Sequence, residues 1–99
     1  MYMIRDGKPV QVDILTGAAW LENDDNRHLA ENFIGDIRVS TVFLGIDHNY
    51  SRQGPPVLWE TMAFRSGEAI DRQDRYTSEE AAWAGHEAFC QWVRDGMPQ

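Results

Sequence analysis

The residues best able to do chemistry gather in one connecting segment, residues 47–56, between two apolar stretches. Its length exceeds the two to five residues, roughly, that a simple hairpin loop needs. Gly54-Pro55-Pro56 restricts the exit of the segment, which lowers the entropy lost on binding. A recognition loop at this place, together with the nearby carboxylate of Glu60, is the predicted binding site. The side chains expected to bind are Asp47, His48, Tyr50, Arg52 and Glu60.

A plainer interpretation of the same segment stays open. Asp47 and Asn49 have side chains that often accept hydrogen bonds from nearby backbone amides in turns. Tyr50 would then pack over the edge of a sheet, and the segment would be an ordinary surface connection.

A metal-assisted hydrolase is the alternative from another class. Asp47, His48, Glu60 and His86 could supply oxygen and nitrogen ligands to a divalent metal, with a carboxylate acting as base toward bound water. None of these residues has the spacing of a His-Glu-x-x-His motif, so their meeting depends on the sheet register. His86 also falls on the apolar stripe of a predicted helix, which favours a core histidine that donates to a backbone carbonyl. We therefore assign no catalytic residue and predict no cofactor, and an enzymatic activity is not expected.

Anionic ligands are a further option. The glycines form neither a P-loop nor a dinucleotide fingerprint, which argues against the nucleotide enzymes that carry those motifs. Arginines could still converge on a small phosphate-like group, or they could pair with acidic neighbours on a solvated surface. The residues concerned are Arg52, Arg65, Arg72 and Arg75.

Strands in hairpins are predicted to position these residues. Residues 2–5 and 8–12 flank Asp6-Gly7, a pair suited to a type I′ turn, and residues 27–34 and 37–46 flank Gly35-Asp36, which suits a type II′ turn. Residues 57–65 alternate like a further strand, and residues 72–76 predict a brief one after a turn at 66–71. The sequence indicates an α+β fold with an antiparallel sheet of five or six strands, in a single domain covering residues 1–99.

Two helices are expected beside the sheet. Asp13 can cap a short helix over residues 14–22, and the turn-forming residues 23–26 should end it. Thr77 with Glu80 fits a capping box for a longer helix over residues 78–95, whose apolar stripe can pack on the sheet. Trp83 departs from that stripe, which suits a protein interface or a homodimer contact.

Composition narrows the function classes further. The 99 residues carry 16 acidic and 9 basic side chains, a net charge of −7, so nonspecific nucleic-acid binding is not expected. We predict no membrane association, because no apolar stretch is long enough to span a bilayer. The single cysteine, Cys90, and the lack of a visible secretory signal favour a cytoplasmic location, with Cys90 serving in packing.

A distinctive sequence motif occupies the centre of the chain. It runs VSTVFLGIDHNY over residues 39–50 and GPPVLWETMAF over residues 54–64, followed by RYTSEEA at 75–81 and Gly85-His86. These sequence segments resemble a family of small uncharacterised phage and prophage proteins. The resemblance implies a phage or prophage origin, and no reaction or ligand is carried over from it. We predict a non-enzymatic accessory protein in the bacterial host cell, which binds a host protein or small host ligand, with modulation of host defence or physiology as an extension of the resemblance. A self-associating structural or virion accessory protein is the remaining alternative.

Overall fold

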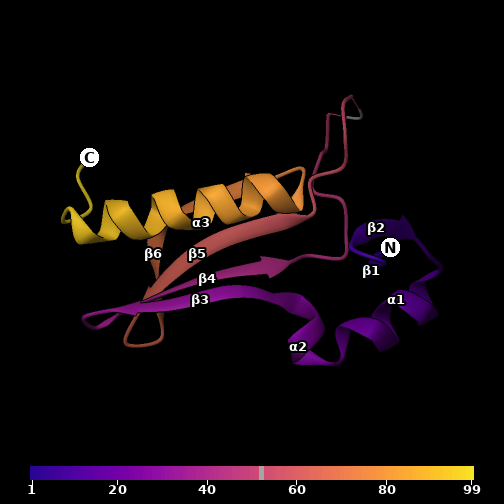
Figure 1. The fold of residues 1–99 in the computed structure, drawn as a ribbon, viewed down its shortest axis with the longest axis horizontal. Helices are drawn as coiled ribbons and strands as arrows, with labels where there is room; N and C mark the ends of the chain where they lie inside the picture. The colour runs from indigo at the N-terminus through magenta and orange to yellow at the C-terminus, as the bar shows by residue number, and fades with distance from the viewer. Residues whose placement is uncertain (52) are drawn as a thin grey trace.

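The fold is α+β, as predicted, and it is built on one large antiparallel sheet. The structure is a computed structural model that describes residues 1–51 and 53–99. Figure 1 shows α3 lying along one face of the sheet, while β1, β2, α1 and α2 gather beyond one end of it. The elements in chain order are β1 (Tyr2–Arg5), β2 (Lys8–Gln11), α1 (Ile14–Leu21), α2 (Asp24–Arg27), β3 (His28–Ile34), β4 (Ile37–Phe43), β5 (Trp59–Arg65), β6 (Glu68–Tyr76) and α3 (Glu79–Arg94).

Tight turns join neighbouring strands in three places. Asp6 and Gly7 between β1 and β2 have φ values of 53° and 77°, as the predicted type I′ turn requires. Gly35 between β3 and β4 has a φ of 60°, in keeping with the predicted type II′ turn. Ser66 and Gly67 join β5 to β6 with φ values of 53° and 82°. This third tight turn was not predicted, because the segment 66–71 read as one longer turn.

The large sheet is a meander with the strand order β3-β4-β5-β6, and β1 pairs with β2 in a separate hairpin. β4 is central, as its apolar residues on both faces predict, although it ends at Phe43 rather than at residue 46. The brief strand predicted at 72–76 is wrong in length, because β6 covers Glu68–Tyr76. Its register with β5 shifts between Met62 and Phe64, and such a bulge interrupts the alternation by which a strand is recognised in sequence.

The helices begin and end close to the predicted limits. Asp13 caps α1 and accepts a hydrogen bond from Thr16 N at 2.8 Å. Residues 24–27, predicted as part of a turn, form the short helix α2, which Asn23 caps. Ser78, rather than Thr77, caps α3 by accepting from the amide of residue 81. No helix in the described part of the chain is long and apolar enough to cross a membrane.

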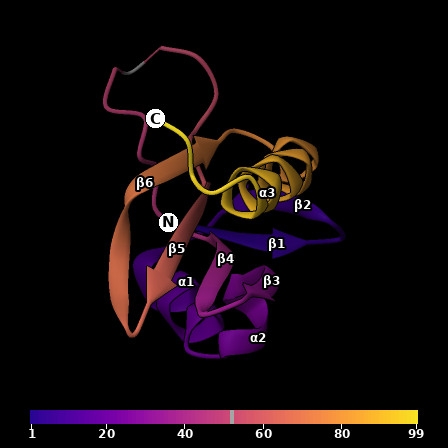
Figure 2. The same ribbon diagram turned by 90° about the vertical axis from the view of Figure 1, so that its left-hand side faces the viewer.

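Two apolar clusters fill the space between α3 and the sheet, which Figure 2 shows nearly along the helix axis. One cluster consists of Ile37, Val39, Ala63, Phe89, Cys90 and Val93, and the other of Phe43, Leu58, Trp59 and Ala82. Polar residues lie between them, since Thr41 stands between Val39 and Phe43 on β4, and His86 stands between Ala82 and Phe89 on α3. Burial raises the pKa of the Cys90 thiol, which suits the packing role predicted for it.

Candidate functional site

The predicted recognition loop projects away from the sheet between β4 and β5 (Figure 1). Its two ends are tied together, because His48 N donates to the carbonyl of Val57 at 2.9 Å and Val57 N donates to Asp47 Oδ1 at 2.8 Å. The same carboxylate oxygen accepts from Asn49 N at 2.7 Å, and His48 Nδ1 donates to the carbonyl of Ile46 at 2.8 Å. Asp47 and His48 therefore fix the base of the loop.

Asn49 holds the outer part of the loop. Its side-chain amide donates to the carbonyls of Gln53 at 2.6 Å and Pro55 at 2.9 Å, and its Oδ1 accepts from Ser51 N at 3.1 Å. Gly54 lies beneath this amide with a φ of 80°, a conformation that glycine adopts without strain. These contacts join both arms of the loop through one side chain.

Tyr50 is the side chain that this loop presents outward. It is 78% exposed, so the expected packing of Tyr50 over the sheet edge is wrong. Its ring centroid lies 6.0 Å from that of the His48 ring, which stands on the base of the loop. Arg52, the fourth predicted loop contact, lies outside the described residues. The loop thus combines the two interpretations: Asp47 and Asn49 satisfy local backbone, and Tyr50 is held out in solvent.

The four side chains considered as metal ligands do not come together. Glu60 lies on the face of β5 that points away from α3 and accepts a hydrogen bond from Arg75 Nε at 2.8 Å. His86 is buried on the opposite side of the sheet, and Asp47 is engaged at the loop base. Among the described residues, no group of three or more His, Cys, Asp or Glu side chains is placed to hold a metal ion.

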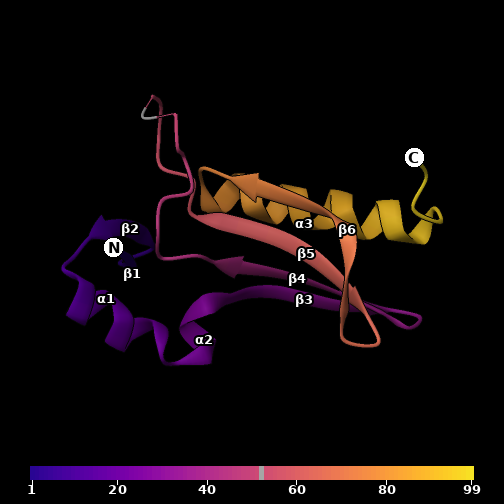
Figure 3. The same cartoon turned by 180° about the vertical axis from the view of Figure 1, so that it is seen from behind.

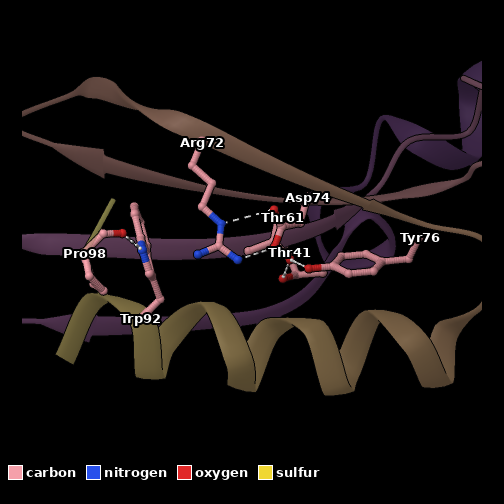
Figure 4. A network of polar contacts seen from close by, with 7 residues as sticks. All are labelled: Thr41, Thr61, Arg72, Asp74, Tyr76, Trp92 and Pro98. Atoms are coloured by element: carbon pink, nitrogen blue, oxygen red, sulfur yellow. Dashed lines mark hydrogen bonds and ion pairs between the residues drawn. The ribbon is translucent and has the colours of Figure 1, made fainter. Parts of the chain in front are cut away.

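The three described arginines of the predicted set do not converge either, and Arg65 pairs with Asp36 at 3.2 Å. Arg72 makes two hydrogen bonds to Asp74, at 3.2 and 2.9 Å, and its guanidinium lies 4.5 Å from the ring centroid of Trp92 on α3 (Figure 4). Arg75 extends to the opposite face of the sheet, where it pairs with Glu60. Arg72 and Arg75 therefore pair with acidic neighbours and do not form a shared anion site.

A chain of polar side chains crosses the interface between α3 and the sheet, and the sequence did not predict it. The Tyr76 hydroxyl donates to Thr61 Oγ1 at 3.0 Å, and Thr61 Oγ1 lies 2.5 Å from Thr41 Oγ1, as Figure 4 shows. Thr41 Oγ1 lies 2.7 Å from His86 Nδ1, and His86 Nε2 lies 2.7 Å from Asn32 Oδ1. Each strand of the large sheet contributes one member, and α3 contributes the histidine.

Proton positions in this chain follow from the pKa of His86. Burial lowers that pKa, so the neutral ring is favoured, with Nε2 donating to Asn32 and Nδ1 accepting from Thr41. Thr41 must then accept from Thr61, which in turn accepts from Tyr76. Burial also raises the pKa of the Tyr76 hydroxyl, which keeps the first donor of the chain protonated. The hydroxyls of Thr41 and Thr61 each donate once and accept once, and the Tyr76 hydroxyl donates at the start of the chain.

Gly85 makes room for the first member of this chain. A Cβ atom at Gly85 would come closer than 3.0 Å to the ring of Tyr76. The pair Gly85-His86 in the middle of a helix was the available sequence signal. Glycine there serves close packing, and the histidine supplies the hydrogen bonds that the buried threonines need. The core histidine was expected to donate to a backbone carbonyl, whereas its partners are the side chains of Thr41 and Asn32.

Trp83, the predicted interface residue, is 46% exposed on the outer side of α3.

No family model matches the chain, and the searches found no curated protein or solved structure that matches it. The relation to phage and prophage proteins therefore stays a prediction, and function has to be inferred from the geometry of the molecule.

Proposed function

We propose that this protein is a non-enzymatic binding protein whose recognition loop, residues 47–56, engages a partner protein. The observation that supports the proposal is that different side chains of the loop have different roles. Asp47 and Asn49 use their side chains to hold the backbone, while Tyr50 is left 78% exposed at the surface. Backbone held in this way at the base and outer part of the loop loses little conformational freedom on binding, and tyrosine is enriched among residues that dominate binding energy.

The shape of the loop favours a protein over a small ligand. Figure 1 shows it standing out from the end of the sheet, so it is a protrusion that a partner must accommodate. Small-molecule sites are usually concave and enclose most of the ligand. The resemblance to phage and prophage proteins supports a protein of the bacterial host as the partner, with interference in host defence or physiology as the consequence.

The proposed metal-assisted hydrolase has weaker support. Its acid–base and ligand candidates each have another partner: Glu60 binds Arg75, His86 binds Thr41 and Asn32, and Asp47 holds the loop.

Affinity capture with loop variants tests the proposal. Immobilised wild-type protein, Tyr50→Ala and Leu15→Ala would be exposed to an extract of the bacterial host, and captured proteins would be identified by mass spectrometry. Leu15 is a matched control, because it is 83% exposed and lies on α1. A true partner should be retained by wild type and by Leu15→Ala and lost by Tyr50→Ala.

Calorimetry with the purified partner then gives the size of the effect. Tyr50→Ala should weaken binding by about 30-fold, the loss that corresponds to about 2 kcal/mol at a dominant contact. Asn49→Ala should weaken it less, because the tyrosine remains while its support is removed. Equal binding of wild type and Tyr50→Ala to every captured protein would contradict a working role for the loop.

A further inference from the structure

The face of the large sheet opposite α3 is open. Figure 3 shows the strands from this side, with α3 behind them and with α1, α2 and the β1–β2 hairpin beyond one end. The strand register places four apolar side chains here: Val42 on β4, Met62 and Phe64 on β5, and Phe33 on the edge strand β3. Arg38 lies between the two phenylalanines, with its guanidinium 4.6 Å from the centroid of the Phe64 ring. Phe33 is 70% exposed. Antiparallel sheets usually turn polar residues toward water on their uncovered face, so this composition calls for a covering partner.

Charge on this open face is nearly balanced, unlike that of the whole protein. Two ion pairs lie across it, Arg38 with Glu31 at 3.2 Å and Arg75 with Glu60 at 2.8 Å. These two pairs are neutral, and Asp71, which lies beside Met62 and Gln73, adds one negative charge, whereas the chain as a whole carries −7. A basic partner would be drawn to other surfaces of the molecule. A second copy, itself acidic, meets the least repulsion at this face.

The shape of the open face suits contact with the same face of a second copy. Phe33 protrudes at one edge, and a hollow of about 60 Å³ lies over Ser40, walled by Val42, Glu60, Met62 and Phe64. Contacts in a two-fold dimer are reciprocal, so a surface must carry both the projection and its receiving site. A two-fold axis in the plane of the face, midway between Phe33 and the hollow, brings each ring toward the hollow of the other copy.

We propose that the protein forms a homodimer by packing the open face of one copy against that of a second copy. The edges of the sheet are less suited, because both edge strands contain register shifts, and β6 carries alternating charges. The open face avoids these obstacles, since its contacts are made by side chains rather than by strand pairing. The dimer would leave Tyr50 and its loop available to another protein.

The size of the face sets the expected strength. Four strands about 4.8 Å apart, each about seven residues long at about 3.4 Å per residue, cover roughly 450 Å². A stable interface buries about 800 Å² on each partner, so this contact belongs to the weak class, with a dissociation constant of about 10 µM to 1 mM. The dimer should therefore appear only as concentration rises.

Sedimentation of the full chain over that concentration range tests the proposal. The average mass should rise from 11.4 kDa toward twice that value. Phe33→Lys should weaken association at least tenfold and hold the mass at the monomer value, with an unchanged circular dichroism spectrum because Phe33 is exposed. Trp83→Lys, which alters the exposed tryptophan of α3, should leave the dimer intact.

Methionine methyl NMR locates the contact without a substitution. The Met62 methyl signal should shift with concentration, and the Met97 signal should not, because Met97 lies beside the end of α3 on the other side of the sheet. A monomeric mass throughout the range would overturn the proposal. So would loss of the dimer in Trp83→Lys rather than Phe33→Lys, or a shift confined to Met97. None of these outcomes affects the role proposed for Tyr50.

Discussion

The two faces of the large sheet carry opposite arrangements of polar and apolar groups. Under α3, two apolar clusters enclose a chain of hydrogen-bonded side chains that includes Thr41, Thr61 and His86. On the open face, apolar side chains surround ion pairs that remain in contact with water. Polar groups are therefore buried where a helix can complete their hydrogen bonds, and apolar groups are exposed where no described helix lies.

The covered face shows what buried polar groups can achieve. The connection between β4 and β5 is a long loop, which does not fix the pairing of the two strands as a tight turn would. Thr41 pairs with Thr61 across these strands. A slip by two residues would place Thr61 opposite Val39 or Phe43 and leave its hydroxyl among apolar groups, at a cost of about 1–3 kcal/mol. We infer that the polar chain helps to select the native register.

Adding a methyl group at Gly85 should produce the largest effect on stability. Gly85→Ala would place a methyl group against the Tyr76 ring and displace its hydroxyl from Thr61. Overpacking of this kind costs about 3 kcal/mol at the upper end, which outweighs the gain of about 1 kcal/mol from better helix propensity. Urea denaturation followed by circular dichroism measures the free energy of unfolding.

A double substitution serves as the control for that prediction. If the ring of Tyr76 causes the loss, Gly85→Ala in a Tyr76→Leu background should cost nothing or should stabilise the helix by up to about 1 kcal/mol. The same loss in both backgrounds would show that the methyl group meets a different obstacle.

Breaking the chain at Thr41 should have the next largest effect. Thr41→Val keeps the shape of the side chain but leaves Thr61 without its acceptor and His86 Nδ1 without its donor. We expect a loss of about 2 kcal/mol in the free energy of unfolding. Ser40→Ala, at the adjacent position on the open face, should cost less than about 1 kcal/mol, since no side-chain hydrogen bond of Ser40 occurs among those of the described residues. Equal losses would remove the distinction between the two faces.

Acid should weaken the covered face through His86. Its pKa in the folded protein lies below the ordinary value of 6.5, so the unfolded chain takes up a proton first as pH falls through that value. Stability is therefore fully present above about pH 7 and declines below about pH 6.5, by at most about 1.4 kcal/mol per pH unit for one proton. Protonation would also require Nδ1 to donate to Thr41, which reverses the hydrogen bonds toward Tyr76. Glu87 lies nearby and opposes the shift only in part.

Urea midpoints measured between about pH 7.5 and about pH 5.5 avoid most carboxylate titration. The slope over this range should disappear in His86→Gln, which lacks the titrating ring. It should remain in His28→Gln, because His28 is exposed on the edge strand. Retention of the full slope in His86→Gln would assign the pH dependence to another group.

The sequence predicted the parts of the fold that depend on local pattern. Alternation and turn residues located β3, β4 and β5, and the helical pattern placed His86 on the apolar stripe of α3. The pairing of Thr41 with Thr61 could not be predicted, because register across a long loop depends on contacts that only the assembled sheet makes. β6 was predicted too short, since the bulge opposite Ala63 disrupts its alternation.

The candidate site was predictable to a similar degree. Loop length and the turn preferences of Asp47 and Asn49 indicated both its position and its local hydrogen bonds. The exposure of Tyr50 was not predictable, because the direction of a loop side chain depends on how the two arms cross-link. The separation of Glu60 from His86 also required the structure, since β5 alternation assigns faces but not which face α3 covers.

The smallest effect is expected on the open face, at the ion pair of Arg38 with Glu31. Both side chains are more than one-third exposed, so water already solvates the charges. Glu31→Gln should change the free energy of unfolding by less than about 0.5 kcal/mol, and about 0.5 M salt should reduce even that difference. Asn32→Leu, one residue along β3 but facing α3, should cost about 1 kcal/mol, because it removes the acceptor of His86 Nε2. A larger loss for Glu31→Gln than for Asn32→Leu would mean that the open face, rather than the covered one, depends on its polar contacts.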